Sequence, residues 1–366
     1  MERKMMWLWL IPIMIYVGYW WLMDRYFHSN ESLGVFSDNE FFKCSIVICV
    51  FNEERNIEKC LNSILLQKEI QNVVEIIVID DGSQDFTYEK AKSILEKSKL
   101  PFQLIKNDVR LGKKRSIEKA LQLSCSESDW VILRDADTYT LSDEWWIELQ
   151  KSLKETTDLV IAPVITEYHK GNWISYLQYF EGLALMHLTY ASAKMHKPIL
   201  GSAANLVFKK KRFLELQPYK DNIHLNTGDD IFLIQKVKKA KGKITAHFHP
   251  NAVVYTYAPC SVKALIQQKS RWLSKTQYVK DSFNSLSALI IGGTNIFFIP
   301  MFLCSFKMAL ISLILKTLID FKILISVQKK LNLKPFSYVY FFIGELVYIL
   351  YVCALIFKFL FSIQRK

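Results

Sequence analysis

Residues 74–85 read "VEIIVIDDGSQD", an apolar run that ends in two aspartates, a glycine and a serine. An unbroken apolar run of this length, bounded by turn residues, is typical of a strand that is buried on both faces. Comparable runs occupy residues 44–50, 102–106 and 130–133, and segments with helical spacing of apolar residues lie between them. This alternation predicts an α/β fold, with a Rossmann-type, mostly parallel sheet and helices on both faces.

The polar residues that follow these strands form the first candidate site, because ligands of such sheets bind beyond the carboxyl ends of the strands. The segments at these positions are "FNEE" (51–54), "DDGS" (80–83) and "RDADT" (134–138). Asp135 and Asp137 would repel each other, and Arg134 is the only cation beside them in the sequence. A divalent ion, Mg²⁺ or Mn²⁺, would offset this repulsion and share its other ligand positions with a diphosphate. Each aspartate could instead cap a helix, and "DDGS" alone could be an ordinary turn.

Two motifs further along the chain add candidate residues. In "NTGDDIFLIQKV", Asp229 and Asp230 begin a predicted helix, although acidic residues also stabilise a helix start simply through its dipole. In "QQKSRWLSK", Gln268, Arg271 and Trp272 share one helical face. An interfacial helix could carry the same residues, since tryptophan is common at membrane boundaries. The histidines of "HFHP" are interpreted as ordinary strand residues.

Composition favours a membrane protein over a nucleic-acid-binding one. Hydrophobic residues make up 51% of the 366 residues, the mean hydropathy is +0.12 and the net charge is +12. The lysines are spread along the chain and no nucleic-acid module is recognisable, so we interpret the positive charge as that of cytoplasmic faces beside a bilayer. The seven cysteines show no metal-site or CxxC spacing, which indicates buried thiols in a reducing compartment.

Apolar segments near both ends are long enough to cross a membrane. Met5–Met23 contains no charge, and the later segments span 288–306, 308–327 and 336–361. The charged residues inside the last two segments are Lys316, Asp320, Lys322 and Glu345. Charges are costly within a bilayer, so residues 308–327 could instead lie flat in the interface.

In chain order, "DDGS", "DAD", "GDD" and "QKSRW" resemble the motif set of the membrane-bound family 2 glycosyltransferases. This group contains cellulose, chitin and hyaluronan synthases and ceramide glucosyltransferase. The resemblance covers residues 44–275 and implies a GT-A-like fold flanked by transmembrane helices. "GDD" stands where the polymerising members have Thr-Glu-Asp, so Asp230 aligns with the final Asp of that triplet and Asp229 with the Glu.

The resemblance also implies roles for individual residues. The catalytic set would be Asp230, Arg271, Gln268 and Trp272, with Asp230 as general base and Arg271 beside the leaving diphosphate. The nucleotide sugar would contact Val50, Asn52, Glu53, Asp80, Asp81, Lys113, Arg115 and Asp135, with Asp81 accepting the uracil N3–H. The acceptor would contact Gly201, Ser202, Asp229 and Trp272. Asp135 and Asp137 would hold Mg²⁺ or Mn²⁺.

The expected organisation is a membrane anchor and linker (1–43), a catalytic domain (44–260), an interfacial helix region (261–284) and membrane segments (285–366). We expect an integral membrane enzyme of a bacterial inner membrane, with its catalytic domain facing the cytoplasm. It would transfer a sugar with inversion from a UDP-sugar to a lipid or a lipid-linked saccharide. A processive polysaccharide synthase is the alternative, because the Gln-x-x-Arg-Trp motif is also typical of that group. An inactive binding subunit is disfavoured by the intact motif set.

Overall fold

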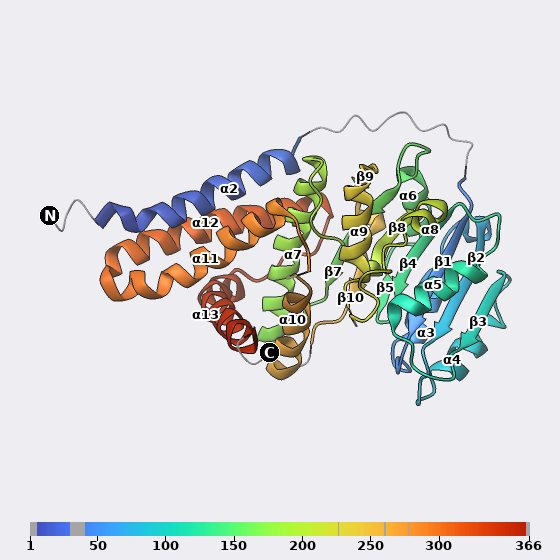
Figure 1. Cartoon of the computed structure of the whole chain (residues 1–366). Helices are drawn as coiled ribbons and strands as arrows, with labels where there is room; N and C mark the ends of the chain where they lie inside the picture. The colour runs from blue at the N-terminus through green and yellow to red at the C-terminus, as the bar shows by residue number, and fades with distance from the viewer. Residues whose placement is uncertain (1–5, 30–40, 226, 260, 277, 364–366) are drawn as a thin grey trace. The chain divides into compact units, whose positions relative to one another are not determined.

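The computed structural model describes residues 6–29, 41–225, 227–259, 261–276 and 278–363. Their contacts divide the chain into two units (Figure 1). The sheet unit comprises Asn30–Thr166 and Leu200–Tyr257, and the helical unit comprises Met1–Ser29, Glu167–Ile199 and Ala258–Lys366. The helical segment 167–199, which lies inside the predicted catalytic range 44–260, therefore interrupts the sheet unit in sequence.

A seven-stranded sheet with the order β3-β2-β1-β4-β8-β6-β9 is the framework of the sheet unit. The strands expected from the sequence are β1 (Cys44–Val50), β2 (Val73–Asp80), β3 (Phe102–Lys106) and β4 (Trp130–Asp135). All pairings among these four strands are parallel. The other strands are β8 (Leu206–Lys209), antiparallel to β4 and to β6 (Leu159–Ile161), and β9 (Ile244–Ala246), parallel to β6. The predicted α/β class with a mostly parallel sheet is confirmed.

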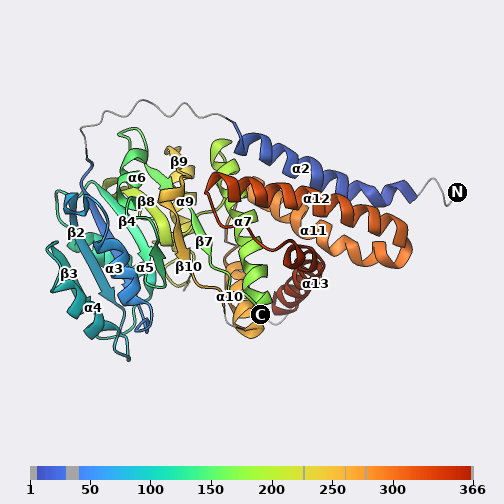
Figure 2. The ribbon, with the colours of Figure 1, turned by 180° about the vertical axis from the view of Figure 1, so that it is seen from behind.

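Helices cover both faces of this sheet. Helix α5 (Lys113–Leu123) lies on the face seen in Figure 1, and α3 (Ile57–Leu65) lies on the face seen in Figure 2. The other helices of the unit are α4 (Thr87–Leu95), α6 (Trp145–Ser152), α8 (Lys210–Leu216) and α9 (Asp229–Lys239). A small sheet of order β5-β10-β7 completes the unit, with β5 at Thr138–Thr140, β7 at Val164–Thr166 and β10 at Val254–Thr256.

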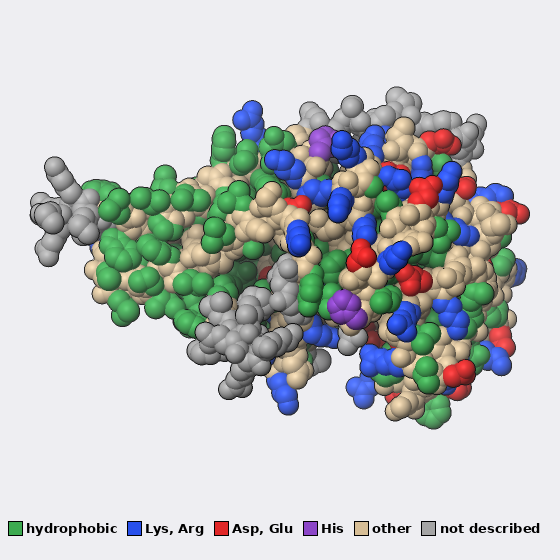
Figure 3. Space-filling model, in the orientation of Figure 1, with side chains coloured by type: hydrophobic (Ala, Val, Ile, Leu, Met, Phe, Trp, Pro, Cys, Tyr) green, Lys and Arg blue, Asp and Glu red, His purple; other side chains and the backbone are tan. Residues whose placement is uncertain are grey.

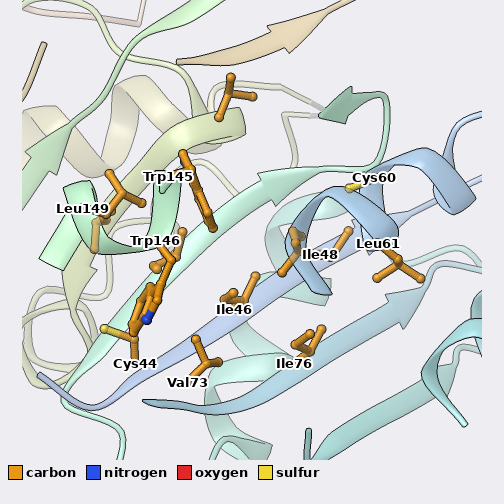
Figure 4. Close-up of a cluster of buried hydrophobic side chains, with 14 of the residues drawn as sticks. Cys44, Ile46, Ile48, Cys60, Leu61, Val73, Ile76, Trp145, Trp146 and Leu149 are labelled. Carbon is orange, nitrogen blue, oxygen red and sulfur yellow. The ribbon is translucent and has the colours of Figure 1, made fainter. Parts of the chain in front are cut away.

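The core of the sheet unit explains why its strands have unbroken apolar sequences. Ile46 and Ile48 of β1 and Ile76 of β2 are fully buried, and they pack against Leu61 of α3 (Figure 4). Each such side chain contributes about 1.5–3 kcal/mol through removal from water. A second group in the same cluster comprises Cys44, Val73, Trp145, Trp146 and Leu149. This core fixes the ends of β1, β2 and β4, from which the site loops emerge.

The helical unit consists of long helices with largely apolar surfaces. Its helices are α2 (Ile11–Phe27), α7 (Trp173–Lys194), α10 (Val262–Thr276), α11 (Ser282–Cys304), α12 (Phe306–Lys330) and α13 (Tyr338–Ile363). Hydrophobic side chains cover much of the visible surface over α2, α11 and α12 (Figure 3). Leu289 and Leu303 of α11 and Leu350 of α13 are each at least 69% exposed. In water, so large an apolar surface would be unusual, so it indicates a membrane or protein partner.

Two helices in the described part of the chain are long and apolar enough to cross a membrane by length and composition. They are Ser282–Cys304 and Tyr338–Lys358, which overlap the predicted segments 288–306 and 336–361. Helix α12 carries the buried Lys316 and Asp320 in its middle, which distinguishes it from these two. Spanning by Met5–Met23 and by 308–327 stays a prediction.

Candidate functional site

The site loops join one another where β1 and β2 end. The N–H of Asp81 donates to the carbonyl of Val50 over 2.8 Å. The N–H of Asn52 donates to Ser83 Oγ over 3.0 Å, and Asn52 Oδ1 accepts from the N–H of Gln84 over 2.9 Å. "FNEE" and "DDGS" are far apart in the sequence, but their hydrogen bonds join them into one structure at the carboxyl edge of the sheet. Asn52 has the positive φ of 55° that such a close return of the backbone requires.

Asp81 anchors the segment that begins α5. Its buried carboxylate accepts from the N–H groups of Leu111 and Gly112, each over 2.8 Å. It also accepts from Asn107 Nδ2 over 2.9 Å and from Ser116 Oγ over 3.2 Å. These bonds hold Gly112 in its left-handed conformation, φ 90°, and fix the direction of α5. Helix α5 begins at Lys113, directly after this glycine.

Asp80 differs from Asp81 in the bonds that it makes. Its Oδ1 accepts from the N–H of Ser83 over 2.7 Å, whereas its buried Oδ2 has no hydrogen-bond partner among the described residues. A buried acceptor without a partner is rare in folded proteins and calls for an explanation. Asp80 therefore holds the acceptor atom that a ligand N–H could satisfy.

Lys113 connects two motifs that are far apart in the sequence. Its ammonium lies 2.5 Å from Asp135 Oδ1 and 2.7 Å from Asp229 Oδ2. Burial alone would lower the pKa of Lys113, but the two carboxylates hold that pKa well above its usual value. The "DAD" loop and the start of α9 thus meet at one cation. Arg134, the neighbouring cation in the sequence, does not join these motifs. It is buried in the core, with its Cζ 4.8 Å from the ring centroid of Trp145.

Asp137 lies in an acidic environment that suits a divalent ion. Burial and the neighbouring carboxylates of Asp135 and Glu53 raise the pKa of Asp137 to about 7, against the opposing effect of Lys113. Within the described ranges, no group of three or more His, Cys, Asp or Glu side chains could hold a metal by itself. One or two carboxylates suffice for Mg²⁺ when phosphate oxygens and water supply the remaining ligands. Asp135 and Asp137 therefore fit an ion that arrives with a diphosphate.

Asp229 and Asp230 begin α9, as the sequence predicted, but they have different surroundings. The Asp229 side chain is 12% exposed and pairs with Lys113. Asp230 is less buried, and its Oδ1 accepts from the N–H of Ile231 over 2.7 Å. Gly228, with φ 96°, directs the chain into the helix, and a Cβ there would lie 2.6 Å from the Phe232 ring. Glycine is therefore required at this turn.

The loop that contains Gly201 and Ser202, residues 201–205 ("GSAAN"), is firmly built into the sheet unit. The hydroxyl of Ser202 accepts from the N–H of Ala204 over 3.3 Å. A Cβ on Gly201 would lie 2.5 Å from the Ile234 side chain of α9. Asn205 is fully buried, donates to the carbonyls of Pro163 and Ala252, and accepts from Trp145 Nε1. The loop that contains Gly201 and Ser202 is thus rigid and lies against α9.

The remaining predicted residues fall in two places. Arg115 is exposed on α5, two residues after Lys113 and therefore on a different side of the helix. Gln268, Arg271 and Trp272 lie on α10 of the helical unit, where the Lys269 ammonium sits 3.8 Å from the centroid of the Trp272 ring system. Their contribution to the site stays a prediction. The bridging position of Lys113 and the anchoring bond from Asn107 were missed by sequence reasoning, because neither has a signature near it in sequence.

Comparison with known families agrees with this geometry. The family model described as Glycosyl transferase family 2 matches residues 45–237, more than half of the chain. The chain belongs to glycosyltransferase family 2. The family 2 match runs from β1 into α9, so it contains all three aspartate motifs and ends before the Gln-x-x-Arg-Trp helix α10. The narrower membrane subgroup rests on that helix and stays a proposal.

Several relatives share parts of this family 2 region. The dolichol-phosphate mannosyltransferase of Pyrococcus furiosus is 28% identical over 149 residues, 39% of this chain and 40% of that protein. The SPbeta prophage-derived glycosyltransferase SunS of Bacillus subtilis is 33% identical over 135 residues, 36% of this chain and 29% of that protein. The chain thus spans less than half the length of either relative.

One solved structure resembles nearly the whole chain. It is the mannosyltransferase PcManGT from Pyrobaculum calidifontis, in complex with GDP-Man and Mn²⁺. The TM-score is 0.66 at 15% identity, over 96% of each chain. At this identity the likeness concerns the fold, and it confirms the predicted GT-A-like fold.

Proposed function

We propose that this chain is a membrane-anchored, inverting glycosyltransferase that uses a uridine nucleotide sugar. Its acceptor would be a hydroxyl of a lipid or of a lipid-linked saccharide. The observation that carries the proposal is the bridge from Lys113 to Asp135 and Asp229. This bridge brings the donor motif "DAD" and the acceptor motif "GDD" together in a family 2 domain.

The proposed reaction needs one base and one leaving group. Asp230 takes the proton of the acceptor hydroxyl as that oxygen attacks the anomeric carbon. The new carbon–oxygen bond forms on the face opposite the diphosphate. The bond from the anomeric carbon to the phosphate oxygen breaks, and its electron pair stays on the diphosphate. Attack from the opposite face inverts the anomeric centre. Lys113 and Arg271 supply positive charge near the diphosphate.

Residues around the donor motifs would position the nucleotide. Asp81 would accept the uracil N3–H, with Asp80 supporting it, and the bonds from Leu111 and Gly112 to Asp81 hold the loop beside it. Asp135 and Asp137 would hold Mg²⁺ or Mn²⁺, which would neutralise the diphosphate charge when bound. The Mn²⁺ in PcManGT, which shares the fold, supports this part of the proposal.

The membrane part of the proposal rests on the helical unit. Helices α11 and α13 are apolar and exposed enough to lie in a bilayer. The name of the Pyrococcus relative, a dolichol-phosphate mannosyltransferase, supports a lipid-linked acceptor. We place the enzyme in a bacterial inner membrane with the sheet unit in the cytoplasm, where nucleotide sugars are available. A processive polysaccharide synthase remains the second candidate because of Gln268, Arg271 and Trp272 on α10.

The test is transfer by the full chain in detergent-solubilised membranes. Radiolabelled UDP- and GDP-sugars are incubated with and without Mn²⁺, and the products are separated into organic and aqueous phases. We expect metal-dependent label in the organic phase from a UDP-sugar, as a single added sugar. A ladder of products would favour the synthase. Label that persists after complete chelation would contradict the metal assignment, and Asp137→Asn should match the chelated wild type.

A further inference from the structure

The helical unit contains a cavity that the transfer chemistry does not use. Its volume is about 80 Å³, and its walls come from α2, α7, α11, α12 and α13. Most of the wall is apolar, including Leu177, Phe180 and Leu185 of α7 and Ile323 of α12. A space of this size exceeds that needed for a single water molecule several-fold, so it could admit a section of a lipid chain.

Three carboxylates interrupt this apolar wall: Glu181 of α7, Asp320 of α12 and Glu345 of α13. The fully buried Lys316 lies 2.6 Å from both Asp320 and Glu345. Lys269 lies 2.6 Å from Glu181. Two ammonium groups therefore face three carboxyl groups, and both ammonium groups are already paired, so these five groups offer no unpaired positive charge to an anion.

This lack of an unpaired cation decides which polar group the cavity would accept. An additional anion would add repulsion in a poorly hydrated environment, where such repulsion is costly. An additional cation would lose its hydration on leaving water. The two ammonium groups already compensate most of the carboxylate charge, so little attraction would offset that cost. A hydroxyl donates a hydrogen bond to a carboxylate without either cost. Tyr16 shows this contact within the protein itself, since its hydroxyl donates to Asp320 Oδ1 over 2.7 Å.

We propose that this cavity binds an uncharged, hydroxyl-bearing lipid, with its chain along the apolar wall and its hydroxyl at the carboxylates. Diacylglycerol represents this class, and phosphatidic acid has the same chains with an anionic phosphate. As a binding site, the proposal is independent of transfer. As a statement about the acceptor class, it rests on the proposed function.

The experiment measures lipid binding by the full chain in detergent micelles. Radiolabelled diacylglycerol, phosphatidic acid and dodecylamine are compared, with no nucleotide sugar present. We expect diacylglycerol to bind about tenfold more tightly than phosphatidic acid, which corresponds to about 1.4 kcal/mol. Equal binding of phosphatidic acid would overturn the charge argument, and tighter binding of dodecylamine would overturn the choice of a neutral lipid.

Two kinds of variant locate the site. Ala184→Phe fills the cavity from α7 and should reduce diacylglycerol binding about tenfold. Ile314→Phe adds bulk at a 52% exposed position of α12 and should leave binding unchanged. Ala184→Leu provides a smaller filling residue if the Phe variant has a lowered Tm. Unchanged binding in a well-folded Ala184 variant would show that the lipid binds elsewhere.

Glu345→Gln tests the carboxylates without filling the cavity. The variant leaves two ammonium groups with two carboxyl groups, which should bring phosphatidic acid binding to within about threefold of diacylglycerol binding. An unchanged preference for diacylglycerol would contradict the role of the charge network. Transfer activity is measured separately on the same preparations. Binding without transfer would count against the proposed function alone, and transfer without diacylglycerol binding would count against the cavity proposal alone.

Discussion

At the scale of single residues, Asp229 and Asp230 allow a direct test of which carboxylate is the base. Asp230→Asn keeps the shape of the side chain but cannot take up the acceptor proton. We expect kcat to fall about 10²–10⁴-fold, because that is the usual contribution of a general base. Nucleotide affinity should change little, since the base acts mainly in the transition state. Single-turnover rates and nucleotide titration provide the measurements.

Asp229→Asn is the matched variant, because Asp229 pairs with Lys113 whereas Asp230 is less buried and accepts from the N–H of Ile231. We expect Asp229→Asn to cost less in kcat and more in nucleotide affinity than Asp230→Asn. Loss of transfer in Asp229→Asn with near wild-type kcat in Asp230→Asn would show that the base is Asp229.

Lys113→Met tests the bridge between the motifs. Lys113 is 30% exposed and contacts two carboxylates, so its removal leaves Asp135 and Asp229 without their shared cation. We expect a loss of about 1–3 kcal/mol in the free energy of unfolding, as for other charged hydrogen bonds, together with weaker nucleotide binding. Urea denaturation and nucleotide titration check the two effects.

The control for this variant is Lys92→Met, which removes an exposed ion pair between Lys92 of α4 and Glu96, the residue after that helix. Such pairs contribute about 0.2–1 kcal/mol. Equal destabilisation by the two variants would mean that the Lys113 bridge adds nothing beyond an ordinary surface pair.

At the scale of elements, the start of α9 depends on Gly228. Alanine there would need a left-handed conformation and would also press its Cβ against Phe232. We expect Gly228→Ala to lower the free energy of unfolding by about 1–3 kcal/mol and to lower kcat, because Asp230 follows directly. Gly171→Ala is the control: its φ of 83° is similar, but a Cβ there would meet open space. If both variants lose the same stability, the contact with Phe232 is unimportant.

Helix α6 and the segment after β9 are joined by a carboxylate that makes stability depend on pH. Glu148 Oε2 lies 3.4 Å from His247 Nε2 and 3.2 Å from His249 Nδ1, and Lys151 lies 2.6 Å from Glu148 Oε1. Burial alone would raise the pKa of Glu148, but the close contacts with His247 and Lys151 lower it to about 2. The folded form therefore gains stability above the unfolded pKa near 4.5 and loses it as the pH falls toward 2.

We expect Glu148→Gln to be about 1–3 kcal/mol less stable than wild type at pH 6, as judged by urea denaturation. The difference should shrink between pH 4.5 and 2, because the wild-type carboxylate becomes protonated there. A difference that stays constant over this interval would show that Glu148 acts through packing rather than charge.

The strands of the large sheet were predictable from the sequence, because the burial of a strand determines the residues within that strand. Strands β1, β2 and β4 are buried on both faces, so their sequences are mostly apolar, and the polar site loops follow them. Strand β3 lies at the edge of the sheet and is partly exposed. The bridge at Lys113 was not predictable, because its partners lie in distant loops that only the folded sheet brings together. Helix α7 is apolar on most of its surface, so its periodicity did not show which unit it packs with.

At the scale of the whole molecule, the helical segment 167–199 determines how the chain can be divided. Helix α7 contacts α2, α12 and α13, all of which a fragment of residues 44–260 would lack. We expect this fragment to aggregate in water, because α7 would expose buried residues such as Leu183 and Ala191. The same fragment with residues 167–199 replaced by a flexible linker of about 12 residues should be monomeric and bind nucleotide.

Size-exclusion chromatography and nucleotide-dependent changes in Tm test this prediction. A monomeric 44–260 fragment that carries α7 would contradict the assignment of that helix to the helical unit. An aggregating linker fragment would show that the sheet unit does not fold without the helices.

The interruption of the sheet unit by α7 also constrains biosynthesis. Strand β8 lies between β4 and β6 in the sheet, yet the ribosome makes it after α7. One edge of β4 therefore stays unpaired while α7 emerges from the ribosome. Helix α7 stays without α12 and α13 for longer, because they are synthesised later. At about 5–20 residues per second, α7 precedes α13 by roughly 10–30 s. During that interval an unpaired strand edge and an apolar helix are exposed together, so the nascent chain needs a bilayer or a chaperone beside it before its last helices exist.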